Sequence, residues 1–174
     1  TANTWPGPKD KMPFGQLPVL YHNGLTIPQS GTIARYCSSL ANLVPTRIKD
    51  TVISDMLMEH SNDIFNLFSK AKYSGDKEKQ REAWISVRDE KLPRMLGHLV
   101  KLLGDKEYFT GSILCAGDVA VFSVINFLIF ILLFRRTIYI ILLFSLVTYF
   151  INMPTKWKKP LQRNRVFTTV RVMV

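Results

Sequence analysis

The spacing of apolar and polar residues near the start of the chain predicts two strands followed by a helix. Two short apolar segments, LPVLYH at 17–22 and LTIP at 25–28, flank the dipeptide Asn23-Gly24. This dipeptide favours a two-residue type I′ hairpin turn, because both residues accept positive φ. Residues 30–40 then carry apolar side chains at helical spacing behind Ser30, a natural N-cap residue.

Two long helical patterns follow the hairpin. From about residue 46 to 72, apolar side chains recur every three or four positions, among them Ile53, Leu57 and Phe68. The stretch YSGD at 73–76 ends this pattern. A second run, from about 77 to 103, contains Pro93 as an expected kink and ends at Gly104-Asp105. Its inward side chains are predicted to be Trp84, Val87, Leu92, Leu96, Leu99, Val100 and Leu103.

Residues 111–128 predict a loop and the start of a buried helix. Asp118 in this stretch is placed to accept hydrogen bonds from the N-terminus of its own helix. The pattern over residues 1–128 therefore predicts an α/β unit followed by an all-helical one. We expect domains at residues 1–42 and 46–128, with 129–174 as a divergent apolar and basic tail.

The tail differs from the rest of the chain in composition and allows three interpretations. Residues 1–128 carry 15 basic and 13 acidic side chains, whereas residues 129–174 carry 8 basic and none acidic. Arg135-Arg136 separates an uncharged run of 16 residues at 119–134, which begins before the tail, from one of 15 residues at 137–151, and a membrane span needs about 20. The tail is a membrane hairpin or interfacial anchor, a buried helix pair, or sequence that is not native coding sequence. The abrupt change in composition favours the last of these.

The distribution of charge and the spacing of the cysteines and histidines argue against several kinds of partner and site. The chain has a pI of about 9.8, but the nearly balanced charge of residues 1–128 argues against a nucleic-acid partner. Cys37 and Cys115 form no Cys-x-x-Cys pair, and no signal peptide is visible, so we expect reduced thiols and a cytoplasmic location. The three histidines lack metal-ligand spacing, and no metal is expected.

Several motifs together resemble one family. They are WPxxK at 5–9, PFGQLPVL at 13–20, QSxxIARY at 29–36, LPRMLGHL at 92–99 and GSILCAGD at 111–118. On these motifs, residues 5 to about 127 resemble a sigma-class glutathione transferase, the group that includes prostaglandin D synthases. The resemblance implies a partial thioredoxin-like domain, consisting of the hairpin and a helix, followed by the helical C-terminal domain of that family. It also implies glutathione as co-substrate, a small hydrophobic electrophile and a homodimer.

The resemblance assigns the cysteinyl and γ-glutamyl parts of glutathione to the hairpin and the helix after it. The bond between Leu17 and Pro18 would be cis and would turn the backbone of Leu17 toward the cysteinyl part. Gln29 and Ser30 would hold the γ-glutamyl end, which agrees with the affinity of a helix N-terminus for a carboxylate. From the residues alone, Pro18 could instead be a plain edge-strand proline and Ser30 only an N-cap.

The same resemblance assigns the remaining contacts. Trp5 and Lys9 match residues that contact the glycyl carboxylate, and Gln16 could reach it through its amide. Asp63, or its neighbour Asn62, matches an acidic residue that reaches across the dimer, and Asp63 is preferred. A packing role for Trp5 and a solvated helix charge at Asp63 are the alternatives.

The family begins with a strand bearing a tyrosine, a helix and a second strand, and this chain does not contain them. That tyrosine favours the thiolate of glutathione, so we assign no catalytic residue and expect slow conjugation. We also expect an unprotected edge beside the hairpin and a poorly stable chain. The primary hypothesis is a glutathione transferase involved in detoxification. A non-enzymatic, crystallin-like binding protein on the same fold and a membrane-attached relative are the alternatives.

Overall fold

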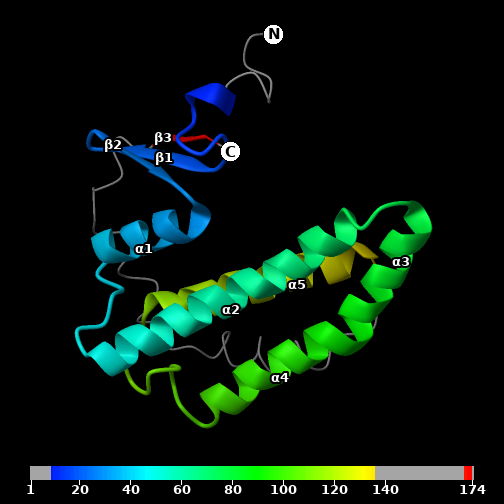
Figure 1. The fold of residues 1–174 in the computed structure, drawn as a ribbon. Helices are drawn as coiled ribbons and strands as arrows, with labels where there is room; N and C mark the ends of the chain where they lie inside the picture. The colour runs from blue at the N-terminus through cyan, green and yellow to red at the C-terminus, as the bar shows by residue number, and fades with distance from the viewer. Residues whose placement is uncertain (1–8, 136–170, 174) are drawn as a thin grey trace. The chain divides into compact units, whose positions relative to one another are not determined.

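The computed structural model describes residues 9–135 and 171–173 of the chain, with Lys9, residues 132–135 and residues 171–173 described by their backbone only. The chain divides into two compact units (Figure 1). One consists of Thr1–Leu43 with Pro154–Val174, and the other of Val44–Met153. Most of the tail, residues 136–170 and 174, lies outside the described residues, so the three interpretations of that segment stay open.

The first unit contains the predicted hairpin. A 3-10 turn at Lys9–Lys11 precedes β1 (Val19–His22) and β2 (Leu25–Pro28), which pair in antiparallel register from Val19 opposite Pro28 to His22 opposite Leu25. Asn23 and Gly24 have φ values of 48° and 76°. The positive φ at both positions confirms the predicted turn, which only residues tolerant of the left-handed region form easily.

A third strand covers the second edge of β1. β3 (Arg171–Met173) pairs antiparallel with β1 and gives the strand order β2-β1-β3 (Figure 1). The expectation of an unprotected edge is therefore wrong for β1. The reason is that a segment from the far end of the sequence supplies the hydrogen-bonding partner, and local sequence patterns carry no signal for such a pairing.

Helix α1 (Ser30–Leu40) follows the hairpin and begins one residue earlier than predicted. Ser30 is already helical, and the N-cap position is held by Gln29, whose side chain makes no capping hydrogen bond. The prediction of Ser30 as N-cap is therefore wrong. The chain enters the helix through Gln29 in an unusual conformation, with φ 72° and ψ 118°, and this shifts the start of the helix.

The second unit is helical, as predicted. It contains α2 (Ile48–Lys72), α3 (Lys77–Ser86), α4 (Leu92–Leu103) and α5 (Ala116–Arg135), and five residues in a π-helical turn, Val87–Lys91, connect α3 to α4. This turn interrupts the regular helix directly before Leu92-Pro93, where the sequence predicted a kink. Pro93 cannot donate to the carbonyl four residues back, and the wider turn gives its ring space. The amide of Leu92 accordingly donates to the carbonyl of Val87, five residues back.

The core of this unit lies between α2, α4 and α5. Fourteen buried side chains form it: Leu57, Ile64, Phe68, Ala71, Val87, Leu92, Leu96, Leu99, Leu103, Phe109, Val121, Val124, Ile125 and Leu128. The predicted inward face of residues 77–103 is confirmed at Val87, Leu92, Leu96, Leu99 and Leu103. Val100 is 46% exposed and was wrongly predicted to point inward. Val100 directly follows Leu99, so in the regular helix α4 its side chain lies about 100° around the axis from that of Leu99, at the edge of the buried stripe.

Asp118 organises the start of α5. Its carboxylate accepts hydrogen bonds from Phe109 N at 3.0 Å, from Cys115 N at 2.9 Å and from Cys115 Sγ at 2.9 Å. All three residues are buried. This confirms the prediction that Asp118 reaches back to its own helix terminus. It also ties the loop that precedes α5 to the helix, because Phe109 lies nine residues upstream.

The first turn of α5 lies directly against α2. Gly117 N donates to Ser54 Oγ at 3.0 Å. An added Cβ at Gly117 would lie 2.8 Å from the backbone oxygen of Ser54 and 2.9 Å from two side-chain atoms of Leu57. Only glycine fits this contact without displacing the backbone of α2.

The first turn of α2 contains a buried carboxylate with a charged partner. Arg47 Nε lies 2.7 Å from Asp50 Oδ2, and Arg47 Nη2 donates to Asp50 Oδ1 at 3.1 Å. The side chain of Asp50 is buried, whereas that of Arg47 is exposed. The hydrogen bonds from Arg47 lower the pKa of Asp50, with the positive charge of Arg47 acting in the same direction.

This pair predicts a pH dependence of stability. Because the pKa of Asp50 is lower in the folded than in the unfolded chain, its stabilisation is complete above the unfolded pKa, about 3.9, and is lost as the pH falls through the folded pKa. We expect Asp50→Asn to reduce the loss of stability between pH 5 and pH 2, measured as the urea midpoint. Asp105→Asn, at an exposed loop position, is the control. An unchanged acid limb in Asp50→Asn would contradict the prediction.

Candidate functional site

A cis peptide bond marks the entrance to the hairpin. The structure places a cis bond between Leu17 and Pro18, directly before β1. This confirms the expectation drawn from the family resemblance. The bond turns the chain after Gly15, whose amide donates to the carbonyl of Met12 at 3.0 Å, and leaves Leu17 half-buried. The backbone of Leu17 therefore lies two residues before Val19, the first paired residue of β1, where an extended ligand can pair with it.

The N-terminus of α1 lies after the same hairpin. The first hydrogen bond of the helix runs from Ile33 N to the carbonyl of Gln29 at 2.9 Å. The amides of Ser30, Gly31 and Thr32 therefore come before the first intrahelical hydrogen bond and point out of the helix end. The helix dipole favours an anion at this end. Gln29 and Ser30 are exposed. The arrangement suits a carboxylate, as in other anion sites at helix N-termini.

Gln29 carries backbone strain at this position. A residue other than glycine rarely adopts φ 72° with ψ 118°, and such strain costs about 1–3 kcal/mol. Strained residues cluster where a ligand must be held. This conformation could not be predicted from the sequence, because glutamine has no preference for positive φ.

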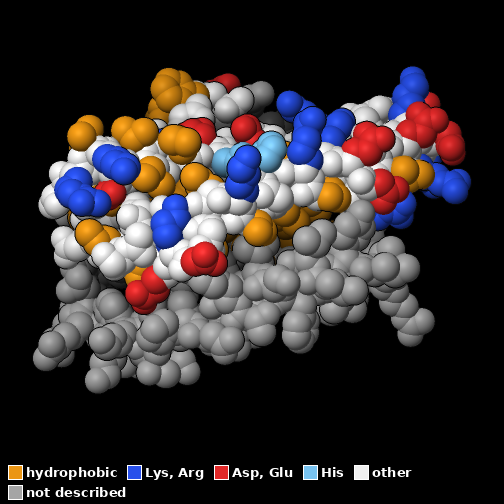
Figure 2. Space-filling model, turned by 90° about the horizontal axis from the view of Figure 1, so that it is seen from below, with side chains coloured by type: hydrophobic (Ala, Val, Ile, Leu, Met, Phe, Trp, Pro, Cys, Tyr) orange, Lys and Arg blue, Asp and Glu red, His pale blue; other side chains and the backbone are white. Residues whose placement is uncertain are grey.

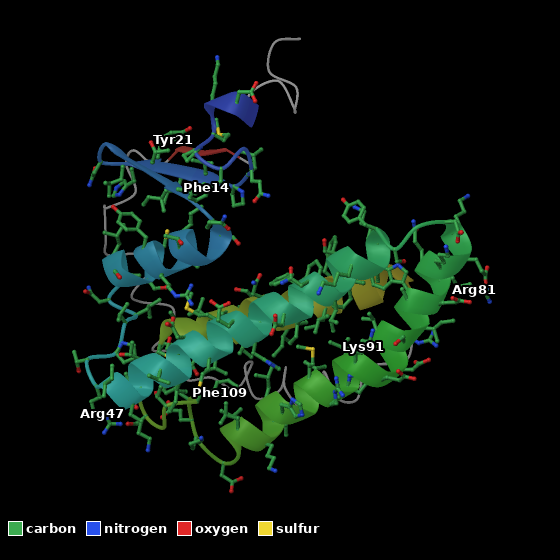
Figure 3. The ribbon with its side chains drawn as sticks, viewed as in Figure 1. Phe14, Tyr21, Arg47, Arg81, Lys91 and Phe109 are labelled. Carbon is green, nitrogen blue, oxygen red and sulfur yellow. The ribbon has the colours of Figure 1, made fainter. Side chains whose placement is uncertain are left out.

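A hydrogen bond that the sequence did not suggest joins the hairpin to α1. His22 Nδ1 lies 2.8 Å from the hydroxyl of Tyr36, and the two rings meet edge to face at 5.7 Å. His22 is buried. The hydroxyl of Tyr21, labelled on β1 in Figure 3, donates to the sulfur of Met12 at 3.8 Å. Both tyrosine hydroxyls therefore have partners within this unit.

The remaining predicted contacts of this unit are described only in part. Gln16 is exposed, next to the cis bond. Lys9 begins the 3-10 turn, but its side chain is not described, and Trp5 lies outside the described residues. Their roles at the glycyl end of a ligand stay predictions.

The exposed face of α2 in the helical unit contains Asp63. A hollow of about 540 Å³ lies along this face, lined by Val52, Asp55, Met56, Glu59, His60 and Asp63. Val52 and Met56 are 51% and 55% exposed. A second hollow shares Met56 and His60 and continues to α4. Asn62, the alternative to Asp63, does not line either hollow.

Two histidines meet beside this face. The rings of His60 and His98 have centroids 6.2 Å apart, and His60 Nε2 lies 3.1 Å from the carbonyl of Met95. Figure 2 shows histidine side chains beside hydrophobic and charged side chains on one face of the molecule. The sequence placed these histidines in separate elements and did not reveal the contact. Among the described residues, no three side chains of the metal-binding types are grouped to hold a metal ion.

Cys115 is not a nucleophile in this structure. Burial raises the pKa of its thiol to about 11, and the hydrogen bond to Asp118 acts in the same direction. The thiol therefore stays protonated near neutral pH, and thiolate is the reactive form.

Among the helices within the described ranges, none combines the length and apolar character required to cross a membrane.

Comparison with known proteins identifies relatives of this chain. Residues 62–153 match the family described as "Glutathione S-transferase, C-terminal domain". The chain is 33% identical to hematopoietic prostaglandin D synthase of Mus musculus over 114 residues, which cover 66% of the chain and 56% of that protein. It is 29% identical to glutathione S-transferase 2 of Gallus gallus over 124 residues, which cover 70% of the chain and 54% of that protein. The chain thus spans about half the length of these curated relatives.

Solved structures show the same similarity in three dimensions. The prostaglandin synthase D of Nilaparvata lugens is 25% identical, with a TM-score of 0.66, and the match covers 92% of this chain and 80% of the other. Rat prostaglandin D synthase in complex with a quinoline is 26% identical, with a TM-score of 0.65 and the same coverage. The predicted fold, a partial thioredoxin-like unit followed by a helical one, is therefore confirmed.

Proposed function

The chain belongs to the glutathione S-transferase family, and from this premise we propose that its first unit binds glutathione. The observation that carries the proposal is the combination of a cis bond at Leu17-Pro18 with a strained Gln29 at the N-terminus of α1. These two features lie at the two ends of one hairpin. Together they offer backbone groups to a short peptide and partial positive charge to its carboxylate.

Each part of glutathione has an assigned contact in this proposal. The backbone of Leu17 pairs with the cysteinyl residue in the manner of a strand, and Ser30 donates its hydroxyl and amide to the γ-glutamyl carboxylate while Gln29 flanks it. Trp5, Lys9 and Gln16 contact the glycyl carboxylate.

We expect Ser30→Ala to weaken glutathione binding about tenfold, because a hydrogen bond to a charged group is worth about 1.5 kcal/mol. Isothermal titration of the full chain with glutathione measures the affinity. Ser39→Ala is a matched control on the same helix, where the hydroxyl donates to the carbonyl of Arg35 at 3.1 Å. Equal losses in the two variants, or none in either, would contradict the assignment of Ser30.

We also propose that two copies associate through the exposed face of α2, with Asp63 of one copy contacting the γ-glutamyl amine bound to the other. Exposed Val52 and Met56 on this face support association, since apolar side chains gain from burial. Asp63 lies on the same face as these side chains, whereas Asn62 does not line the hollow. A site shared between copies is common where symmetric subunits meet.

Mixing two variants that each lack one contact to glutathione tests the shared site. Asp63→Asn and Ser30→Ala each remove one contact, so each pure variant is expected to bind glutathione weakly. In an equal mixture, a heterodimer contains one site with both wild-type residues, and roughly one quarter of all sites should recover the parent affinity. No recovery, in a mixture shown by sedimentation to exchange subunits, would mean that Ser30 and Asp63 do not act on one ligand across a dimer.

The proposed activity of the whole protein is the addition of glutathione to a small hydrophobic electrophile in the cytoplasm. Both described cysteines are free, which suits a reducing compartment. A non-enzymatic glutathione-binding protein is the second candidate, because the hydroxyls of Tyr21 and Tyr36 bond to Met12 and His22. Turnover of a chlorodinitrobenzene substrate above the uncatalysed rate distinguishes the two candidates.

A further inference from the structure

We propose that His22 and Tyr36 form a positioning pair, which aims the N-terminus of α1 at the γ-glutamyl carboxylate of glutathione. The inference rests on the proposed function, because it concerns how the anion site at Ser30 is held in place. His22 is the last residue of β1, and Tyr36 lies in the second turn of α1. Both residues act through the orientation of the helix and not through contact with the ligand.

The lengths of the hairpin and of α1 explain why these two residues meet. Pro28 lies opposite Val19, so the chain has returned to the end of the hairpin next to the cis bond before α1 begins. Three residues of strand from Val19 to His22 cover about 10 Å. Six residues of helix from Ser30 to Tyr36 cover about 9 Å. Because α1 packs against both strands, Tyr36 comes level with His22 at the other end of β1 (Figure 1).

The contact between His22 and Tyr36 fixes one point of α1. None of the residues of α1, all of which the structure describes, is buried, so this helix has less hydrophobic anchoring than one with core side chains. His22 is buried, and its Nδ1 lies 2.8 Å from the hydroxyl of Tyr36, with the two rings edge to face. The hydroxyl donates when Nδ1 is unprotonated and accepts when Nδ1 carries the proton. Both tautomers of the neutral ring therefore form the bond.

Gln29 is the second point at which α1 is held. It joins the helix directly to β2, in the strained conformation described above. Without the bond at Tyr36, α1 can tilt about Gln29, and such a tilt turns the amides of Ser30 and Gly31 away from a bound carboxylate. Hydrogen bonds weaken as the donor angle departs from linearity, steeply below about 120°. His22 and Tyr36 therefore control the strength of the anion site from about 9 Å away.

Two ligands that differ only at the anion site test the pair in the full chain. γ-Aminobutyryl-cysteinylglycine is glutathione without the γ-glutamyl carboxylate. The ratio of its dissociation constant to that of glutathione, measured by titration calorimetry, therefore reports the contribution of that carboxylate. In the parent protein this ratio should be at least about ten, as expected for a hydrogen bond to a charged group.

Tyr36→Phe is expected to reduce this ratio at least about threefold, because it removes the hydroxyl that bonds to His22. Tyr21→Phe is the matched control. It makes the same chemical change in the same unit, where the hydroxyl donates to the sulfur of Met12, and it should leave the ratio unchanged. A loss of overall stability would weaken both ligands equally and would not change the ratio.

Variants of His22 give a second route, which also serves if Tyr36→Phe does not fold. His22→Leu removes the hydrogen bond and should reduce the ratio as much as Tyr36→Phe does. The double variant His22→Leu, Tyr36→Phe should reduce it no further, because the two side chains act through one contact. His22→Asn keeps a hydrogen-bonding atom near the position of Nδ1, and its ratio should lie closer to that of the parent than the ratio of His22→Leu does.

The outcomes distinguish the positioning pair from the proposed binding site. An unchanged ratio in Tyr36→Phe or in His22→Leu, or an equal fall in Tyr21→Phe, would overturn the pair while leaving the glutathione site intact. A parent protein that binds glutathione no more tightly than the analogue, or does not bind it, would instead contradict the proposed site at Ser30, and the pair with it.

Discussion

Asp118→Ala is expected to lower the free energy of unfolding by about 2–5 kcal/mol, because it leaves two buried amides without an acceptor. The carboxylate accepts from Phe109 N and Cys115 N, and also from the thiol of Cys115. Each unpaired buried donor costs about 1–3 kcal/mol. Urea denaturation followed by circular dichroism at 222 nm measures the loss.

Asp76→Ala is the matched control for this prediction. Asp76 is the N-cap of α3 and accepts from Lys79 N at 2.9 Å, but the site is exposed. Loss of an exposed cap costs about 1 kcal/mol, since water replaces the missing acceptor. If the two substitutions cost the same, burial of the Asp118 contacts would not be the source of their energy.

Gly117→Ala is expected to destabilise the chain by about 1–3 kcal/mol through overpacking. The added methyl group would lie 2.8 Å from the backbone oxygen of Ser54, which cannot move without shifting α2. It would also press on Leu57, a core residue that is 1% exposed. The hydrogen bond from Gly117 N to Ser54 Oγ holds the two helices at this distance. The same urea experiment measures the effect.

Gly97→Ala serves as the control, because it is expected to raise the free energy of unfolding rather than lower it. Gly97 lies within α4, is exposed, and has no atom within 4 Å of an added Cβ. Alanine favours the helix by about 0.5–1 kcal/mol relative to glycine, so this variant should be more stable than the parent. Stabilisation by both substitutions would show that α2 and α5 are not in close contact at Gly117.

Much of the fold follows from short-range signals in the sequence. Asn23-Gly24 specifies the hairpin because few residues accept positive φ, and Pro93 specifies a break because it lacks an N–H. Asp118 was identified as a capping residue because its partners lie within one loop of it. Two of the predictions that failed were also local, whereas the expectation of an unprotected edge failed because of a long-range pairing. Ser30 was displaced from the cap by the conformation of Gln29, and Val100 lies at the edge of the buried stripe of α4 rather than in the core.

The candidate site was predicted from motifs, and the tertiary structure added what motifs do not contain. The sequence suggested the residues at the cis bond and at the start of α1 through a family resemblance. It did not suggest the bond between His22 and Tyr36 or the strain at Gln29. These features depend on how the hairpin meets α1. Histidine, tyrosine and glutamine have no local preference that would predict them.

The sequence by itself determined the elements, their order and the family, because turn chemistry, helical periodicity and motif spacing are properties of neighbouring residues. Only the tertiary structure decided the contact of Ser54 with Gly117, the meeting of His60 with His98, and the pairing of β1 with β3. Each of these joins residues far apart in the chain. Such contacts are fixed by the packing and hydrogen bonding of whole elements, which no local pattern specifies.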